Sequence, residues 1–532
     1  MLGPGRTGAS GARERRYGMG IACTARQVEE ANHVIIRRVC AVFAAAVICG
    51  CMLTQFMPGG AFAVEPGFPG ILRPEAREEF ERLLYRYDSF WDEPDASTVV
   101  YSPPGRESVP RLISKDDAQS DVDFLFAVLR YGYAGYQFFG GDKAFLQARQ
   151  DILTEIDNFR GKNLTSSQFA AILQRRLGFV QDGHFSIARK STCRRYRFFA
   201  RFDMEFDELE GRFYVRQMPD RWVAAVEGED PSRWMKMSLG SDGEVLCCLG
   251  TLSDADRDIC VKLEWSDGSS EFVWLNVVDS AIIEGPVYQL KHMEGIPVVV
   301  TRFLMPLPDT MAELDALVRD AAELREAPAV ILDLRSNGGG SDWYPMEWVR
   351  RFAGVDLYPA GFDAQLVTST AAKMLENTAS SLGAELPAVE DSAGSADVQS
   401  WLAGMADPDR PGWGRVSAAE SVRAENDTFL VVLIDSYVYS AGESFVGFLR
   451  QLDNVVFVGT NTYGAMLMGN IGVCLLPSSR LELSCGSLIS LGEDFSNLDG
   501  RGYMPDLWVR PDEALERAVK YIHTVLADGR ER

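Results

Sequence analysis

After Gly295, apolar strands and amphipathic helices alternate along the chain. The apolar runs "IPVVVTRF", "AVILDL" and "TFLVVLID" are separated by the helical patterns "TMAELDALVRDAAELREA" and "YPMEWVRRF". This alternation predicts a layered α/β domain, because strands joined through helices pair in parallel and are covered on both faces. We therefore expect one α/β domain over residues 291–532, with a Gly-, Ala-, Ser- and Pro-rich insertion at 355–427.

Two other patterns precede this domain. Residues 64–192 carry apolar positions at three- and four-residue spacing, as in "DVDFLFAVLRYGYAGYQFF", which predicts a helical region. Residues 193–290 consist of short alternating runs such as "RFYVRQM" and "EFVWLNVV", separated by "SDG" turns. They predict an intervening β-rich domain.

The first 63 residues have the order of a secretory signal peptide. Arg37 and Arg38 precede an uncharged apolar stretch at 39–57, and the small-residue site "AFA" follows at Ala61–Ala63. This order predicts export and cleavage before Val64. The apolar stretch is also close to the length of a membrane helix, so an uncleaved anchor is the alternative, and it would be the only membrane contact.

Charge and cysteine usage limit the partners and cofactors. The formal net charge is −23 and no cluster of Lys and Arg follows residue 63, which argues against a nucleic-acid binder. No spacing of Cys and His indicates a zinc site, and we expect neither a metal nor an organic cofactor. Cys474 and Cys485 flank a predicted hairpin and are the first choice for a disulfide, with buried free thiols as the alternative. The sequence leaves the oligomeric state open.

A strand, a turn and a helix are predicted at "FLVVLIDSYVYSAGESF". This order would present Ser440 at the end of a sheet. The small residues Ala441 and Gly442 would let the first N–H groups of the helix approach a substrate oxygen. The alternative is that Ser440 only caps the helix, with Glu443 completing a capping box.

A second strand, turn and helix occurs at "AVILDLRSNGGGSDWYPMEW". Gly338, Gly339 and Gly340 allow positive φ and a backbone N–H aimed at a ligand, which suits an oxyanion hole. The segment lacks the lysine and the spacing of a phosphate-binding P-loop. The alternative is a flexible surface turn.

A nucleophilic serine needs a base, and histidine is the usual base at neutral pH. His33 lies in the targeting segment, His292 in a predicted turn and His523 on the last helix. This leaves His184, in "VQDGHFSI", as the candidate base.

Five segments in this order resemble the S41 serine peptidases, the tail-specific or C-terminal processing protease family: "VQDGHFSI", "AVILDLRSNGGGS", "VVLIDSYVYSAGESF", "FVGTNTYGAMLMG" and "LDGRGYMPDLWV". The resemblance spans most of residues 115–515. It implies an S41-type catalytic domain with a crotonase- or ClpP-like layered sheet at 291–532, and it places the "DGH" motif in the helical region 64–192. Residues 193–290 stand where many relatives carry a peptide-binding PDZ domain, but they contain no convincing PDZ carboxylate loop.

The family has two catalytic designs, and the sequence distinguishes them. The processing-protease branch uses a lysine in a "TxGKG" motif, where this chain has "TYGAM" with Ala465. No lysine occurs between Lys373 and Lys520, which argues against a Ser–Lys dyad. The tricorn-like branch uses a histidine and a late acid, and "DGH" matches the position of that histidine.

Two residues depart from the tricorn-like pattern. Asp499, in "NLDGRGYMPD", stands where the family has a glutamate, and Glu493 and Asp494 are the alternatives. Gly183 replaces the serine that precedes the tricorn-like histidine.

The resemblance implies that Ser440 is the nucleophile, that His184 transfers its proton and that Asp499 holds the histidine tautomer. Backbone N–H groups of Gly339 or Gly340 and of Ala441 would form the oxyanion hole. We expect an exported serine endopeptidase that acts on peptides or unstructured protein segments. The alternatives are an inactive relative that binds peptides or other ligands, and a crotonase-like acyl-CoA enzyme, against which the export signal argues.

Overall fold

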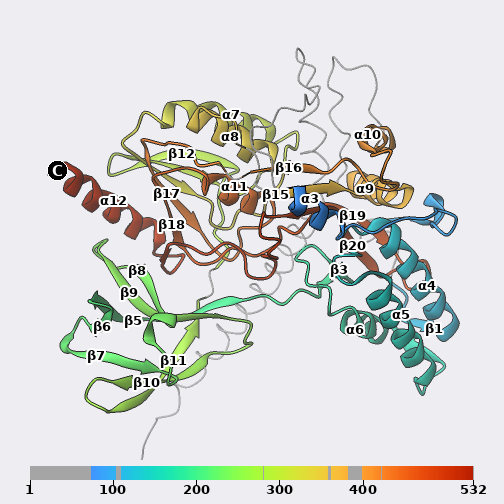
Figure 1. The fold of residues 1–532 in the computed structure, drawn as a ribbon, viewed down its shortest axis with the longest axis horizontal. Coiled ribbons are helices and arrows are strands. Elements are labelled where there is room, and N and C mark those ends of the chain that lie inside the picture. The colour runs from blue at the N-terminus through green and yellow to red at the C-terminus, as the bar shows by residue number, and fades with distance from the viewer. Residues whose placement is uncertain are drawn as a thin grey trace, which may run out of the picture. The chain divides into compact units, whose positions relative to one another are not determined.

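The computed structural model describes residues 74–102, 109–278, 281–357, 361–381, 398–420 and 422–530 (Figure 1). Contacts group the chain into two units, Met1–Phe43 and Ala44–Arg532, and every described residue lies in the second. The predicted signal segment, its cleavage site before Val64 and the apolar stretch at 39–57 lie outside the described residues. Within the described ranges, no helix has the length and apolar character needed to cross a bilayer.

The first described region is mainly helical, as its periodicity predicts. Helix α6 begins with a capping box between Thr165 and Gln168, which satisfies N–H groups that the first turn leaves unpaired. The apolar faces of α4, α5 and α6 join one core cluster. The elements of this region are α3 (Pro74–Glu81), η1 (Ala96–Thr98), β1 (Leu112–Ser114), α4 (Lys115–Gly132), α5 (Gly141–Asn158), β2 (Asn163–Thr165), α6 (Ser166–Arg176), β3 (Ser186–Ile187) and β4 (Lys190–Ser191).

The next region is a β-barrel. Strand β11 pairs with both β10 and β5, so β5, β6, β7, β10 and β11 form a closed ring, and β9 and β8 continue from β5. The barrel has a core of its own, and alternate residues of β10 face it, namely Val261, Leu263 and Trp265. The elements are β5 (Arg197–Leu209), β6 (Arg212–Val215), β7 (Met218–Val226), η2 (Pro231–Arg233), β8 (Met235–Leu239), β9 (Val245–Ser253), β10 (Ile259–Trp265) and β11 (Ser270–Val277).

The α/β region is built on a six-stranded sheet in the order β12-β13-β14-β17-β18-β21. Only the β12–β13 pair is antiparallel. The elements are β12 (Tyr288–Met293), β13 (Ile296–Thr301), α7 (Met311–Leu324), β14 (Ala329–Asp333), α8 (Trp343–Ala353), β17 (Phe429–Ile434), α11 (Ala441–Leu449), β18 (Val455–Gly459), β21 (Leu507–Trp508) and α12 (Ala514–Arg530).

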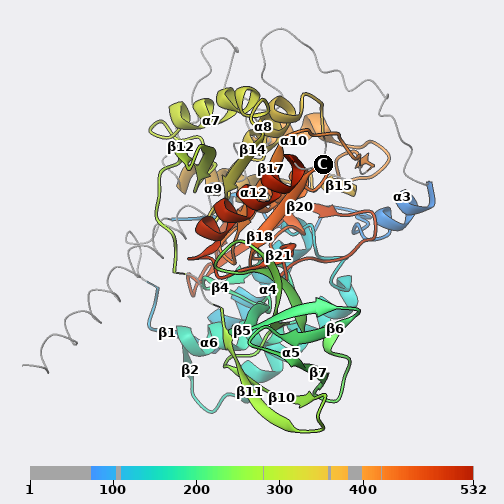
Figure 2. The same cartoon turned by 90° about the vertical axis from the view of Figure 1, so that its left-hand side faces the viewer.

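Helices cover both faces of this sheet. Val330 and Leu332 of β14 pack in a core with α7, α8 and α11, whereas Ile331 packs on the opposite face with α12. Figures 1 and 2 show α7 and α8 on one side of the strands and α12 on the other. The near-continuous apolar strands of the sequence are therefore explained by burial on two faces. The predicted α/β class, with a helical region before it and a β-rich region between, is confirmed.

The described part of the predicted insertion at 355–427 contributes to a second sheet, in the order β16-β15-β20-β3-β4, with β19 paired to β20. Phe362, Leu366 and Trp413 from this segment are buried in the same core as the N-terminal helices. The segment therefore joins the helical region to the α/β region through packing. The elements are β15 (Gly361–Gln365), α9 (Ser369–Ser381), α10 (Val398–Met405), β16 (Ser417–Ala419), β19 (Met468–Leu475) and β20 (Glu482–Leu491).

The predicted hairpin around the two cysteines is present as β19 and β20, but the first-choice disulfide is not. The register places Cys474 opposite Leu483 and Cys485 opposite Gly472, so the two cysteines are not cross-strand partners. Both thiols are free and buried. The alternative of buried free thiols therefore describes this pair.

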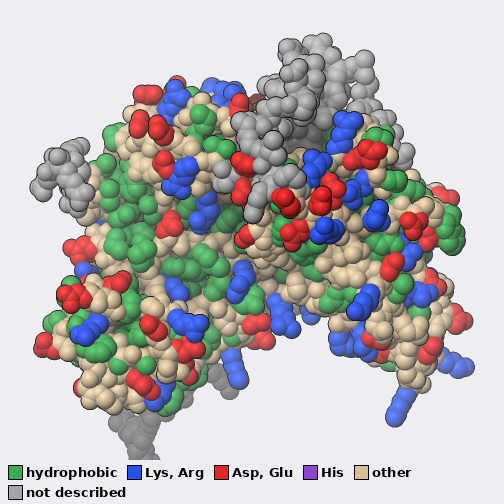
Figure 3. All heavy atoms as spheres, viewed as in Figure 1, with side chains coloured by type: hydrophobic (Ala, Val, Ile, Leu, Met, Phe, Trp, Pro, Cys, Tyr) green, Lys and Arg blue, Asp and Glu red, His purple; other side chains and the backbone are tan. Residues whose placement is uncertain are grey.

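Acidic and basic side chains are intermixed on the face of the molecule that Figure 3 shows. Lys and Arg side chains lie among Asp and Glu side chains there and do not form one continuous basic surface.

Candidate active site

Ser440 lies in a tight turn between β17 and α11. Its backbone has φ 52° and ψ −122°, a conformation that a residue with a side chain adopts only at a cost. The side chain is half-buried and makes no capping hydrogen bond to the helix. Glu443, the expected partner in a capping box, instead accepts hydrogen bonds from elsewhere. The capping interpretation is therefore wrong, because the Ser440 hydroxyl does not cap the N-terminus of α11.

The glycine loop lies directly against this turn because β14 and β17 are neighbouring parallel strands. A Cβ atom on Gly339 would come within 2.6 Å of the Tyr439 carbonyl oxygen and 3.0 Å of Ser440 Cβ. Gly339 also has φ 82°, so only glycine fits here without strain. Asn337 links the two turns, since its carbonyl accepts the Tyr439 N–H at 3.0 Å.

The three glycine N–H groups differ in their hydrogen bonds. Gly338 donates to the Arg302 carbonyl at 3.1 Å, and Gly339 donates to Asn337 Oδ1 at 2.9 Å. Among the described residues, no acceptor is found for the N–H of Gly340 or of Ala441. These two donors are therefore available for the predicted oxyanion hole, whereas Gly339 is already engaged.

His184 is brought to the same place from the helical region. Its ring packs edge-on against Tyr439, the residue before Ser440, with ring centroids 4.8 Å apart. Tyr439 Oη donates to the Gly183 carbonyl at 3.3 Å. Within the described part of the chain, no hydrogen bond joins Ser440 Oγ to the ring of His184, and Nδ1 is buried without a partner.

Burial determines the charge of this histidine. Only 8% of its surface is exposed, and the loss of hydration lowers the pKa of His184 to about 3. The imidazole is therefore neutral at ordinary pH, which is the form that accepts a proton.

Asp499 binds the backbone next to His184 and not the ring. Its carboxylate accepts N–H groups from Gly183 at 2.7 Å, Met466 at 2.7 Å and Leu467 at 2.9 Å. Desolvation raises the pKa of Asp499. The two alternatives are exposed at the surface, and Asp494 accepts the nearby Ser496 N–H. Asp499 is the buried acid of the three, and it binds the turn that carries His184 through the Gly183 N–H.

A second carboxylate, that of Asp182, also binds the turn that carries His184. Asp182 Oδ1 accepts the His184 N–H at 2.8 Å, and Oδ2 accepts the Tyr133 hydroxyl at 2.9 Å. Burial raises the pKa of Asp182, and the nearby charge of Asp499 raises it further. Sequence reasoning assigned no role to Asp182 beyond its place in "DGH", and nothing distinguished Tyr133 from the other tyrosines of its segment.

Gly183 and Ala465 lie in contact with each other. A Cβ atom on Gly183 would lie 2.4 Å from the Gly464 carbonyl oxygen and 2.7 Å from Ala465 Cβ. A larger side chain at position 183 would displace Gly464 and Ala465. Gly183 and Ala465 are therefore a matched pair.

Glu443 binds the segment at 462–465, which includes Ala465. It accepts hydrogen bonds from Thr462 Oγ1 at 2.6 Å and from the N–H groups of Gly464 and Ala465, both at 2.8 Å. Desolvation raises the pKa of Glu443 to about 7. From the sequence, Glu443 is predicted only as the partner in a capping box, so sequence reasoning missed this role.

The other described histidines lie on different elements. His292 is an exposed residue of β12. His523 lies on α12, and its Nε2 is 3.2 Å from the carboxylate of Glu294. His33 lies outside the described residues. In the described ranges, no group of three or more His, Cys, Asp or Glu side chains is placed to hold a metal ion.

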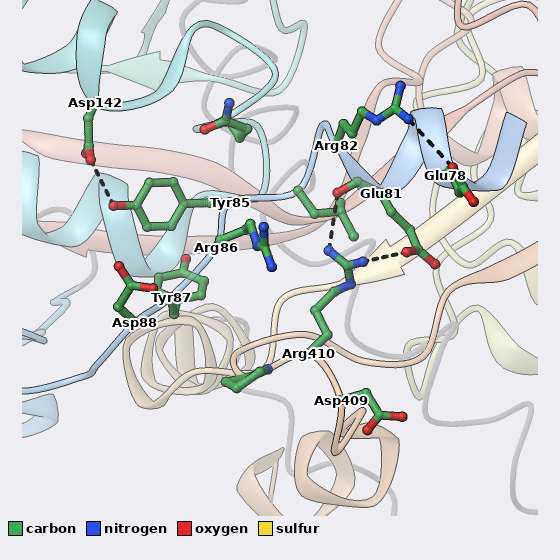
Figure 4. Close-up of a pocket in the computed structure, with 13 residues that line it drawn as sticks. Glu78, Glu81, Arg82, Tyr85, Arg86, Tyr87, Asp88, Asp142, Asp409 and Arg410 are labelled. Carbon is green, nitrogen blue, oxygen red and sulfur yellow. Dashed lines mark hydrogen bonds and ion pairs between the residues drawn. The ribbon is translucent and has the colours of Figure 1, made fainter. Parts of the chain in front are cut away.

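A surface cavity of about 920 Å³ lies elsewhere, between α3, the start of α5 and the Asp409–Pro411 loop (Figure 4). Arg410 crosses to Glu81, and the Tyr85 hydroxyl donates to Asp142 at 3.0 Å. None of the predicted site residues lines this cavity.

Comparison with known proteins assigns part of the chain to a family. Residues 297–474 match the model of peptidase family S41. No curated protein matches the chain.

Several solved structures resemble the fold at low identity. Mature CPAF complexed with lactacystin is 14% identical over 78% of this chain and 99% of that chain, with a TM-score of 0.41. A photosystem II D1 C-terminal processing protease is 13% identical over 76% of this chain and 97% of that chain, with a TM-score of 0.33. A putative peptidase from Parabacteroides merdae is 14% identical over 76% and 96%, with a TM-score of 0.38.

Proposed function

We propose that this chain, whose residues 297–474 belong to peptidase family S41, is an exported serine endopeptidase that cleaves peptides or unstructured protein segments. One observation carries the proposal. A serine in a strained turn between strand and helix lies against a glycine loop and beside a buried histidine. Nucleophile, base and oxyanion donors come from separate parts of the chain and are the three components that acyl transfer needs.

In the proposed reaction, Ser440 Oγ attacks the carbonyl carbon of the scissile bond while His184 accepts the hydroxyl proton. The N–H groups of Gly340 and Ala441 stabilise the oxygen that becomes negative. His184 then gives the proton to the leaving amine, and water completes hydrolysis of the acyl-enzyme. Substrate must first bring the serine hydroxyl and the imidazole into hydrogen-bond contact, and such contacts are often longer in unliganded enzymes.

Asp499 stays the proposed third member of the site. Its carboxylate accepts the Gly183 N–H, which supports a role in holding the turn that carries His184. The tautomer function expected from the family requires a contact with Nδ1, which is buried and has no partner among the described residues.

Export and the mature start at Val64 remain part of the proposal. The order of basic residues, apolar stretch and "AFA" site supports them.

An inactive peptide-binding relative is the second candidate. The observation that favours it is the lack of a hydrogen bond between Ser440 and His184 in the described part of the chain. The two proposals differ in one assay, the cleavage of an unstructured polypeptide by the purified chain.

The assay compares the native chain with Ser440→Ala and His184→Ala, and uses His292→Ala as the matched control. The peptidase proposal predicts cleavage that both site variants abolish and that the exposed His292 does not affect. Binding of the polypeptide without any cleavage by the native chain would favour the inactive relative.

A further inference from the structure

Tyr133 and Asp182 connect the helical region to the turn that carries His184. Tyr133 follows the last residue of α4, with 1% of its surface exposed, and Asp182 is fully buried. The tyrosine hydroxyl donates to Asp182 Oδ2 at 2.9 Å, and Asp182 Oδ1 accepts the His184 N–H at 2.8 Å. One carboxylate therefore joins a residue at the end of α4 to the backbone of the proposed base.

The neighbouring backbone keeps both ends of this connection fixed. The Ala134 N–H donates to the Gly486 carbonyl of β20 at 3.0 Å, and β3, which follows His184, pairs with the same strand through Ser186 and Ser484. Gly135 leaves room for the hydroxyl, because a Cβ atom there would lie 2.5 Å from Tyr133 Oη. The hydroxyl is therefore held in place by packing on rigid elements.

We infer that Tyr133 is a positioning residue for the proposed base, acting through Asp182 to hold the turn that places His184 beside Ser440; this role rests on the proposed function. The physical reason is the titration of this carboxyl group: burial and the charge of Asp499 raise the pKa of Asp182 to about 8, and the hydrogen bond from Tyr133 favours the ionised form. A buried charge is stable only when its oxygens accept hydrogen bonds, and the Tyr133 hydroxyl supplies one of them. An ionised Asp182 in turn binds the His184 N–H more strongly than a neutral one.

The surroundings of Asp182 make this donor important. Burial and the charge of Asp499 raise the pKa of Asp182, while the Tyr133 hydroxyl and the His184 N–H oppose that rise. Burial raises the pKa of Tyr133 well above its usual value, so its hydroxyl stays protonated and keeps donating. The titratable groups that interact with Asp182 are Asp499, His184, Tyr133, Tyr439, Cys193 and Cys485.

The test compares Tyr133→Phe with Tyr131→Phe. Tyr131 lies in the last turn of α4, two residues before Tyr133, with 2% of its surface exposed, and its hydroxyl donates to Asp92. Both changes remove one buried hydroxyl, and circular dichroism checks that both variants fold. The readouts are kcat and KM on an unstructured polypeptide, and the pH dependence of labelling of Ser440 by a fluorophosphonate.

We expect Tyr133→Phe to lower kcat roughly 10- to 100-fold with KM unchanged, because a small displacement of a catalytic group costs about this much. We assign the rise in labelling rate with increasing pH to ionisation of Asp182. In Tyr133→Phe this rise should move to higher pH, because the Asp182 carboxylate loses the hydrogen bond from the tyrosine hydroxyl. Asp182→Asn keeps an oxygen for the His184 N–H but has no ionisable carboxyl group. The rise in labelling rate with pH that is due to Asp182 should therefore disappear. Tyr131→Phe should match the native chain in both readouts.

Equal losses in the two tyrosine variants, or a pH profile of Tyr133→Phe identical to that of the native chain, would overturn the inference. Failure of the proposed function has a different result, since the native chain itself would then cleave nothing and Ser440 would not be labelled.

Discussion

At the scale of single residues, the site depends on buried carboxylates that bind backbone N–H groups. Asp499 accepts three such groups, from Gly183, Met466 and Leu467. In Asp499→Asn, an amide NH₂ must face at least one of these donors. We expect a loss of about 1–3 kcal/mol in the free energy of unfolding, because a buried donor is left unpaired. Activity should fall with it, since the displaced turn carries His184.

Glu493→Gln is the control for this change, because Glu493 is exposed. Its effect on stability should stay within about 0.5 kcal/mol. Urea unfolding and kcat on an unstructured polypeptide measure both variants. If Glu493→Gln were inactive and Asp499→Asn active, the acid would be wrongly assigned while the serine mechanism remained.

At the scale of elements, two adjacent strand ends build the site, and Gly339 lies against the turn that carries Ser440. Gly339→Ala places a methyl group 2.6 Å from the Tyr439 carbonyl oxygen at a φ of 82°. We expect a loss of roughly 1–3 kcal/mol in stability from strain, and a loss of activity because the Ser440 turn must shift. Gly338→Ala is the matched control, since no atom lies within 4 Å of its added Cβ. Equal activity in the two variants would show that the loop does not position the serine.

The hairpin of β19 and β20 makes a separate prediction about chemistry. Because Cys474 and Cys485 are buried and not paired across the strands, both should remain thiols in the purified protein. Alkylation without reductant should modify them only after unfolding in guanidinium, since burial raises the pKa of both thiols. A tryptic peptide pair joined by a disulfide in unreduced protein would contradict this register.

At the scale of the whole molecule, the buried acids make stability depend on pH. Burial raises the pKa of Glu443 to about 7 from an ordinary value of 4.5, so the folded state holds a proton that the unfolded state has lost between these values. This contribution to stability is complete below pH 4.5 and is lost as the pH rises through about 7, to a total on the order of 3 kcal/mol. Glu443→Gln should flatten that fall in thermal unfolding measured from pH 4 to 8. An unchanged slope would mean that other groups cause it.

The sequence predicts the parts of this molecule that follow from local pattern. The alternation after Gly295 predicts the layered sheet, and the two strand, turn and helix segments predict that Ser440 and the glycines lie at its edge. The capping box of α6 and the hairpin of β19 and β20 are also local features. Their residues are neighbours in the chain, so propensity and periodicity suffice.

The remaining features depend on contacts between distant segments. The registry that separates Cys474 from Cys485 is set by pairing across the whole hairpin. The hydrogen bond from Tyr133 to Asp182 requires α4 and the histidine turn to pack on the same strand. Glu443 shows a further limit, because its spacing from Ser440 suggests a helix cap, whereas in the fold its carboxylate binds the segment at 462–465. Only the packing of distant segments decides which of these roles the side chain takes.

The central claim is that Ser440 is a nucleophile activated by His184, and fluorophosphonate labelling of the folded chain followed by peptide mapping tests it most directly. The account predicts a single labelled serine, Ser440. Labelling should be absent in Ser440→Ala, strongly slowed in His184→Ala and unchanged in His292→Ala. Labelling at another serine, or at Ser440 with an undiminished rate in His184→Ala, would contradict it.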